Sequence, residues 1–199
     1  MISDEQEFYA EAMARFQALF ARAGEAGLRE PTAMNLATVD ADGRPSSRMV
    51  LLKKVDERGF VFYTNLESRK GRELAGNPNA ALCFFWEPLM EQVRVEGVAD
   101  PVSDEEADAY WATRSRDSQI GAWASRQSEP LDSRESLEKR FDEIKARFRN
   151  RPVPRPPHWS GYRLRPALIE FWVGADSRLH QRTRYRKRGE TWTVDLLNP

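Results

Sequence analysis

Short apolar segments joined by turns occupy residues 33–101, and this succession constrains the fold more than any other feature of the sequence. The first three segments read as strands, and they are AMNLATVD, SSRMVLLKKV and FVFYTN, with the turns DADGRP and DERG between them. A short helix is predicted at residues 68–78, where Gly76 and Pro78 end it, and two more strands follow, AALCFFW and EQVRVEGVAD. The apolar runs indicate a sheet that is closed or covered on both faces.

Helices are predicted on both sides of these strands. Residues 1–27 form an amphipathic helix with a capping box at Ser3 and Gln6, because apolar residues recur at helical spacing up to the breaks at Gly24 and Gly27. Residues 103–149 are expected to be mainly helical. Two capping boxes open helices there, Ser103 with Glu106 and Asp132 with Glu135, and the second helix runs to about Phe148.

The chain returns to strands after residue 149. RNRPVPRPPHW contains four prolines, which exclude a regular helix and indicate a stiff connector. The strands after it lie within residues 160–197 and are GYRLRP, ALIEFWVG, RLHQRTRYR and TWTVDLL. They are too few to form a core of their own, so we expect one domain over residues 1–199. Its predicted fold is α+β, a mostly antiparallel β-barrel with flanking helices.

The charge balance limits the class of partner. The 31 basic and 31 acidic residues cancel, which argues against nucleic acid or an anionic membrane, so any anion must meet a local cluster of cations. The N-terminus has no apolar targeting segment, and no run is long enough to span a bilayer. Cys83 is the single cysteine and is expected to be a buried small hydrophobe, which fits a reducing cytoplasm.

Two clusters of cations interrupt apolar segments in the first half of the chain. In RMVLLKK, strand alternation places Arg48 and Lys53 on opposite faces, so they should not contact one ligand atom unless a bulge intervenes. Solvated strand ends explain that segment better. At Ser68, Arg69 and Lys70 a strand gives way to a helix, whose free N–H groups and dipole can bind an anion. A phosphate cradle and a solvated first turn explain this junction about equally well.

The third cluster lies in SRLHQR. Alternation along a strand would place Arg178, His180 and Arg182 on one face, with Leu179 and Gln181 on the other. Three cationic or titratable groups in a row repel one another unless an anion lies between them, although a solvated edge strand also explains the pattern. Imidazole titrates near neutrality, so His180 is a candidate for proton transfer.

A row of hydroxyl and guanidinium groups occupies YWATRSRDSQIGAWASRQS. Tyr110, Arg114 and Ser118 are spaced four residues apart and would share one face of a single helix. A helix break within residues 115–117 would remove this one-face arrangement without removing the site.

No pattern supports metal, dinucleotide-fold or triad chemistry. Two histidines, His158 and His180, and one cysteine give no metal-ligand spacing, so no metal is expected. GxGxxG, GxxxxGK[ST] and GxSxG do not occur in the sequence. Trp172, directly before the third cluster, is the tryptophan least expected in the core.

Four stretches in register, RMVLLK, VFYTNLESRKG, YWATRSRDSQIGAWASRQS and IEFWVGADSRLHQR, resemble the pyridoxine/pyridoxamine 5′-phosphate oxidase family, over about residues 31–199. The resemblance implies a split-barrel fold and a homodimer that binds FMN at its interface. The FMN contacts that it implies are Arg48, Met49, Val50, Leu51, Leu52, Lys53, Tyr63, Thr64, Arg69, Lys70, Gln92, Gln127, Ser128, Trp172 and Arg182. The substrate contacts that it implies are Lys53, Tyr110, Arg114 and Ser118 at the phosphate, with Arg178, Leu179 and His180 at the ring.

The resemblance also implies the reaction. Pyridoxamine and pyridoxine 5′-phosphates are oxidised to pyridoxal 5′-phosphate by hydride transfer to FMN, and O₂ reoxidises the flavin and yields H₂O₂. Arg178 and His180 are the implied catalytic residues: Arg178 orients the substrate, and His180 assists through hydrogen bonding or proton movement. The flavin performs the redox chemistry, and the protein positions the two ring systems.

Several features depart from the family pattern. The family's longer N-terminal arm is absent, Gln181 stands where an acidic residue or Asn is usual, Val173 follows EFW where Gln, His or Gly is usual, and Leu196 replaces a basic residue. These departures do not touch the implied phosphate ligands, but they bear on lid closure, on the support of His180 and on turnover.

Two alternatives therefore stay open. One is a related flavoenzyme with another substrate, such as a phenazine-pathway oxidase, and the other is a non-catalytic flavin- or pyridoxal-phosphate-binding protein. The phenazine enzymes tend to lack the lysine and the Arg-Asp-Ser segment that hold the vitamer phosphate. Lys53, Arg114 and Ser118 are present in this chain, which favours the vitamer.

Overall fold

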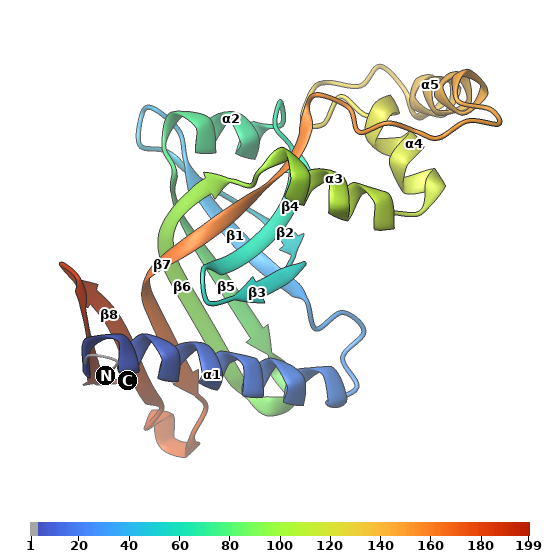
Figure 1. Cartoon of the computed structure of the whole chain (residues 1–199). Coiled ribbons are helices and arrows are strands. Elements are labelled where there is room, and N and C mark those ends of the chain that lie inside the picture. Colours follow the sequence, from blue (N-terminus) through green and yellow to red (C-terminus); the bar gives the residue numbers. More distant parts are fainter. Residues whose placement is uncertain (1–3) are drawn as a thin grey trace.

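The structure, a computed structural model, describes residues 4–199 (Figure 1). Its helices are α1 (Asp4–Glu25), α2 (Arg69–Gly76), α3 (Asp104–Thr113), α4 (Arg116–Ala124) and α5 (Arg134–Arg147), with the 3-10 turns η1 (Glu87–Leu89) and η2 (Asp176–Arg178). Its strands are β1 (Ala33–Val39), β2 (Pro45–Leu51), β3 (Lys54–Asp56), β4 (Gly59–Asn65), β5 (Asn79–Trp86), β6 (Glu91–Pro101), β7 (Trp159–Val173), β8 (Gln181–Arg188) and β9 (Thr191–Leu197).

The strands form one curled sheet in which the pairings are antiparallel (Figure 1). The strand order is β2-β1-β5-β6-β7-β4-β3, and β8 and β9 extend the sheet from β7. The first part of β7 pairs with β4 and the last part pairs with β8, while β6 runs along its other edge. The single long strand β7 therefore connects the two ends of the molecule.

A bulge lets β6 follow the curvature of β7. The pairing of these strands shifts register between Glu96 and Gly97. A Cβ atom on Gly97 would lie 2.0 Å from the carbonyl oxygen of Arg165, so the two backbones can approach this closely only at a glycine.

Two apolar clusters hold the helices to the sheet. α1 closes the inside of the curl, where the buried ring of Phe16 meets Phe60 and Phe84 edge-on at centroid distances of 4.8 and 5.2 Å. Burial of each of these aromatic side chains contributes about 1.5–3 kcal/mol. The second cluster is Trp111, Ile120, Phe148, Val153 and Trp159, and it packs α3 and α4 against the start of β7. Helices α3 to α5 therefore project from one end of the sheet (Figure 1).

The predicted α+β architecture, an antiparallel barrel-like sheet with flanking helices, is confirmed. The strand predicted over SSRMVLLKKV is in fact two strands, because β2 ends at Leu51 and β3 begins at Lys54. GYRLRP and ALIEFWVG, predicted as two strands, form the single strand β7. No helix within residues 4–199 is both long and apolar enough to cross a bilayer.

Three local predictions have different outcomes. Ser103 caps α3 as predicted, and its Oγ accepts a hydrogen bond from the Glu106 N–H at 3.2 Å. The cap of α5 is Ser133 rather than Asp132, while the cap predicted at Ser3 lies outside the described residues. Cys83, predicted to be a buried small hydrophobe, is only half-buried on the outer face of β5, where burial raises the pKa of its thiol.

Candidate functional site

A cavity of about 750 Å³ opens at the end of the sheet that carries α2 to α4. Residues of β2, β4 and α2 form one wall, and residues of α3, α4 and the segment after α4 form the other. Most of the predicted site residues line it: Arg48, Met49, Val50, Leu51, Lys53, Tyr63, Thr64, Arg69, Lys70, Tyr110, Arg114, Ser118, Gln127 and Ser128.

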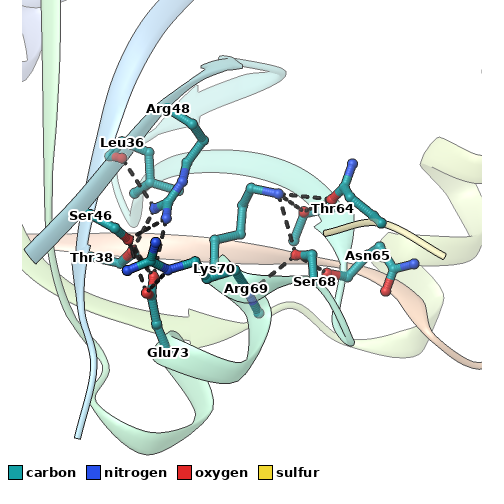
Figure 2. Close-up of polar contacts among 12 residues, drawn as sticks. Leu36, Thr38, Ser46, Arg48, Thr64, Asn65, Ser68, Arg69, Lys70 and Glu73 are labelled. Atoms are coloured by element: carbon teal, nitrogen blue, oxygen red, sulfur yellow. Dashed lines mark hydrogen bonds and ion pairs between the residues drawn. The ribbon is translucent and has the colours of Figure 1, made fainter. Parts of the chain in front are cut away.

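Helix α2 begins at this cavity with a serine cap and a buried lysine (Figure 2). The Oγ atom of Ser68 accepts a hydrogen bond from the Gly71 N–H at 3.3 Å. Lys70 is only 8% exposed, and its Nζ donates to Gln127 Oε1 at 2.8 Å. It also donates to the hydroxyl groups of Thr64 and Ser68, at 3.2 and 3.3 Å.

The ammonium group of Lys70 has no carboxylate among these partners. The pKa of Lys70 is lowered to about 8, mainly by burial and also by the charge of Arg48, while the charge of Glu73 opposes both effects. The N-terminus of α2 adds a partial positive charge, and its first turn contains no acidic residue. A buried cation beside a helix N-terminus suits the phosphate of a ligand. The geometry therefore favours the phosphate cradle over the solvated first turn.

One buried carboxylate arranges the two arginines of this wall. Glu73 is 6% exposed, and its oxygens lie 3.1 Å from Nη2 of Arg48 and 2.8 Å from Nε of Arg69. The hydroxyl groups of Thr38 and Ser46 also donate to it (Figure 2). Burial raises the pKa of Glu73, but these hydrogen bonds outweigh burial and lower it to about 2. Glu73 therefore stays ionised and holds both guanidinium groups at the cavity.

Affinity for FMN is expected to fall as the pH rises above about 8, the pKa of Lys70. Below this pH the ammonium is already charged and would attract the FMN phosphate that the resemblance places beside it. Above it, binding must first take up a proton, so the affinity should drop roughly tenfold between pH 7 and pH 9. Fluorescence titration of the apoprotein with FMN at pH 7, 8 and 9 measures this, and an unchanged dissociation constant would contradict the role of Lys70.

The opposite wall carries the row Tyr110, Arg114 and Ser118, but not on one helix. α3 ends at Thr113, and Ser115 caps the start of α4. The prediction that one helix carries all three side chains on one face is therefore wrong. The helix break lies at the segment where a break was considered from the sequence. All three side chains nevertheless line the cavity. The break turns the chain so that α3 and α4 present them from two directions.

Arg114 stands out on this wall because its charge is only partly satisfied. Its guanidinium lies 5.0 Å from the centroid of the Trp159 ring, and its Nη2 donates to the Ser118 carbonyl oxygen at 3.2 Å. Its Nε is buried without a hydrogen-bond partner among residues 4–199, and burial lowers the pKa of Arg114. Beside it, Tyr63 and Tyr110 stack at a centroid distance of 4.0 Å. The wall thus offers an aromatic surface with a cation that lacks a full set of acceptors.

Arg48 and Lys53 line the same cavity, contrary to the alternation argument. Strict alternation requires one continuous strand. The chain instead leaves β2 after Leu51, and the backbone N–H groups of Leu52 and Lys53 donate to Thr32 and Val61. This break turns Lys53 toward the cavity and leaves Leu52, a predicted FMN contact, 4% exposed in the core.

The remaining predicted site residues do not line this cavity. They lie near the far end of β7, where β6, β7 and β8 pair, opposite α2 to α4 (Figure 1). We name them the hairpin cluster: Gln92, Trp172, Arg178, Leu179, His180 and Arg182. Gln92 pairs with Trp172, and Trp172 with Arg182. A single chain therefore separates the predicted ligand contacts into two groups.

A strand was predicted to align Arg178, His180 and Arg182, but the first half of that segment is not a strand. Residues 176–178 form the turn η2, with a left-handed backbone at Ser177 and Arg178 (φ 56° and 61°), and β8 begins only at Gln181. The His180 ring packs on Trp172 at 4.6 Å, and its Nδ1 accepts a hydrogen bond from the Ala175 N–H at 3.2 Å. Nε2 of His180 is thus the ring nitrogen that can meet a ligand.

Several residues that line the cavity were not predicted from the sequence. They are Ser46, Ser47, Asn65, Gly121, Ala122, Ser125 and Trp159. Ser46 lies two residues before Arg48 on β2 and therefore on the same face of the strand, so strand alternation could have identified it. Glu73, four residues after Arg69 on α2, could have been found by its helical spacing.

Two family models together match most of this chain. Residues 20–148 match the family described as "Pyridoxamine 5′-phosphate oxidase", and residues 159–199 match the "Pyridoxine 5′-phosphate oxidase C-terminal dimerisation region". Among curated relatives, the pyridoxine/pyridoxamine 5′-phosphate oxidase of Rubrobacter xylanophilus is 59% identical, over 93% of this chain and 85% of the relative. The protein of the same name from Myxococcus xanthus (strain DK1622) is 57% identical, over 93% and 90%.

Two solved structures resemble the fold. PhzG from Burkholderia lata 383, in complex with tetrahydrophenazine-1-carboxylic acid, has a TM-score of 0.89 and 38% identity, with coverage of 94% of this chain and 91% of that one. A pyridoxamine 5′-phosphate oxidase-related, FMN binding protein from Nostoc punctiforme has a TM-score of 0.75 at 19% identity, with coverage of 92% and 97%. The second likeness concerns the fold alone.

Proposed function

Because this chain belongs to the pyridoxine/pyridoxamine 5′-phosphate oxidase family, we propose that it oxidises pyridoxamine and pyridoxine 5′-phosphates to pyridoxal 5′-phosphate, with FMN as cofactor. When bound, FMN would supply the acceptor for the hydride that leaves C4′ of the vitamer, and O₂ is the proposed final acceptor, giving H₂O₂. The observation that carries the proposal is that one cavity has two separate groups of cations, which suits one phosphate from the cofactor and one from the substrate.

The first group fits the phosphate of FMN. Arg48, Arg69 and Lys70 line the cavity beside the N-terminus of α2, and Lys70 is buried without a carboxylate among its hydrogen-bond partners. We assign these three residues, together with Thr64 and Gln127, to the cofactor phosphate and its surroundings. Their charges and donors are held in place before any ligand arrives, which lowers the cost of binding.

The second group fits the phosphate of the vitamer. Lys53 and Arg114 provide charge-assisted donors, and Tyr110 and Ser118 provide hydroxyl groups for the remaining phosphate oxygens. The unpartnered Nε of Arg114 supports this assignment, because a buried guanidinium nitrogen without an acceptor is costly unless a ligand supplies one.

The hairpin cluster is assigned to the ring of the substrate and to the flavin of a partner subunit. Arg178 would orient the substrate, and His180 would hold or move a proton through Nε2, while Gln92, Trp172 and Arg182 would contact FMN. A homodimer is proposed because residues 159–199 match a dimerisation region and the cluster lies away from the cavity of its own chain. Leu179, 70% exposed in the single chain, supports contact with a partner. The cytoplasmic location and the lack of a nucleic-acid partner remain predictions from the composition.

A phenazine-type oxidation is the second candidate, because PhzG has the similar fold described above. A tricyclic carboxylic acid offers no phosphate for the second group of cations. Since Lys53, Arg114 and Ser118 all line the cavity, the vitamer reading is better supported.

The test is to purify the protein, record its flavin spectrum, and assay aldehyde formation from pyridoxamine and pyridoxine 5′-phosphates under air. We expect a yellow protein that forms pyridoxal 5′-phosphate and H₂O₂. A colourless protein that FMN cannot reconstitute would exclude both flavoenzyme readings. A yellow protein that is inert toward both vitamers, but oxidises tetrahydrophenazine-1-carboxylic acid, would select the second candidate.

A further inference from the structure

A buried arginine outside the cavity lies between the two structural elements that carry the vitamer-phosphate ligands. Arg163, in β7, is 7% exposed. Its Nη1 lies 2.5 Å from Asp56 Oδ1 and its Nη2 lies 2.7 Å from Glu106 Oε1. We propose that Arg163 is a positioning residue for the vitamer-phosphate subsite, an inference that rests on the proposed function.

The contact with Glu106 fixes one side of that subsite. Glu106 lies in the first turn of α3, and Tyr110 follows one helical turn later. The Tyr63 hydroxyl donates to the Glu106 carbonyl oxygen at 3.4 Å, and the Tyr63 ring stacks on Tyr110. The pair Arg163–Glu106 therefore sets where α3, and with it Tyr110, stands over the sheet.

The contact with Asp56 fixes the other side. Asp56 ends β3, the three-residue strand that begins directly after Lys53. Lys54 and Arg58 also contact the Asp56 carboxylate, at 3.3 and 3.4 Å, but both are exposed, whereas Arg163 is buried. Arg163 is thus the buried anchor for a short edge strand whose position determines where Lys53 lies.

Loss of Arg163 would do more than remove two ion pairs. The carboxylates of Asp56 and Glu106 would then share one region without the cation between them, and like charges in a partly buried site repel. The repulsion would move β3 and α3 apart, so that Lys53 and Tyr110 would no longer converge on one phosphate. A small displacement of positioning groups is enough to weaken binding strongly.

The cofactor phosphate should be insensitive to this change. Its proposed ligands Arg48 and Arg69 are held by Glu73, and Lys70 is held by Thr64, Ser68 and Gln127. No hydrogen bond or ion pair joins these residues to Arg163 in the described part of the chain. A positioning role predicts a defect in the vitamer site alone, whereas a general structural role predicts a defect in both.

The experiment compares Arg163→Met with the wild type and with Arg165→Met, a matched control two residues along β7 whose exposed side chain pairs with Asp100. For Arg163→Met we expect KM for pyridoxamine 5′-phosphate, and Kd for pyridoxal 5′-phosphate measured by titration of the FMN-loaded protein, to rise on the order of tenfold. The turnover number and the dissociation constant of FMN should stay within about twofold. Arg163→Lys should recover part of the loss, and Arg165→Met should match the wild type.

Equal losses of FMN and vitamer affinity, or an unchanged Kd for pyridoxal 5′-phosphate, would overturn the proposal. If Arg163→Met does not fold, Glu106→Gln removes only one charge of the network and is expected to show the same selective rise in KM and Kd. Wild-type protein that binds pyridoxal 5′-phosphate but oxidises neither vitamer would refute the proposed function and leave the Kd comparison as the test of Arg163.

Discussion

Replacing Lys70 with methionine is expected to weaken FMN binding by roughly 100-fold, the loss of about 3 kcal/mol for a charge-assisted hydrogen bond to phosphate in a buried site. Lys70 is the buried cation of the cofactor group, and its three hydrogen-bond partners are neutral oxygens. Methionine has a similar length and no charge. Because burying an ammonium group is costly, its removal should not lower the stability of the apoprotein. Fluorescence titration of apoprotein with FMN measures the effect.

The control is Lys139→Met, which removes an exposed lysine from α5 and should leave the FMN affinity unchanged. Thermal unfolding of the two apoproteins should give similar melting temperatures. An FMN affinity within twofold of the wild type would show that the phosphate does not meet Lys70, and the assignment of the cofactor group would then fail.

Replacing Arg178 with methionine is expected to reduce kcat/KM by about 100-fold or more while the protein stays yellow. Arg178 lies in the left-handed turn η2, outside the cavity, and is exposed in the single chain. It does not belong to the cations assigned to the FMN phosphate, so cofactor binding should not depend on it. Steady-state kinetics with pyridoxamine 5′-phosphate, together with the flavin absorbance of the purified protein, measure both parts of the prediction.

Arg188→Met is the matched control, because Arg188 is exposed at the other end of β8. It should retain wild-type kinetics. A kcat/KM for Arg178→Met equal to the wild-type value would exclude a role for Arg178 at the substrate. Simultaneous loss of the flavin would place it at the cofactor instead.

The architecture was predictable because its signals are local. Turn residues and apolar runs located most strands of the sheet, and the serine before α2 and the cations after it pointed to the junction that we propose as the phosphate cradle. The break between β2 and β3 was not predictable. Nothing in RMVLLKK indicates that the backbone N–H of Leu52 donates to Thr32 while that of the next residue, Lys53, donates to Val61. That choice is made by partners distant in the sequence.

The same reason explains why the buried ion pairs were missed. Arg163 reads as one more charged residue of an alternating strand, and its partners Asp56 and Glu106 are 107 and 57 positions away. The turn at Ser177 and Arg178 was also hidden, because non-glycine residues rarely adopt a left-handed backbone. Within the hairpin cluster the SRLHQR pattern pointed to the cations and to His180, whereas Gln92 was named by resemblance alone. The pattern could not show that one chain keeps these residues away from the cavity.

The separation of the cavity from the hairpin cluster has a consequence for heredity. If each active site combines the cavity of one subunit with the hairpin cluster of the other, a mutation of Lys70 and a mutation of His180 damage different halves of the active site. Two such defective alleles expressed together would form some mixed pairs in which one site contains both intact halves. Two alleles damaged in the same half could never do so. Whether two mutations compensate for each other would then depend on which end of β7 each one affects.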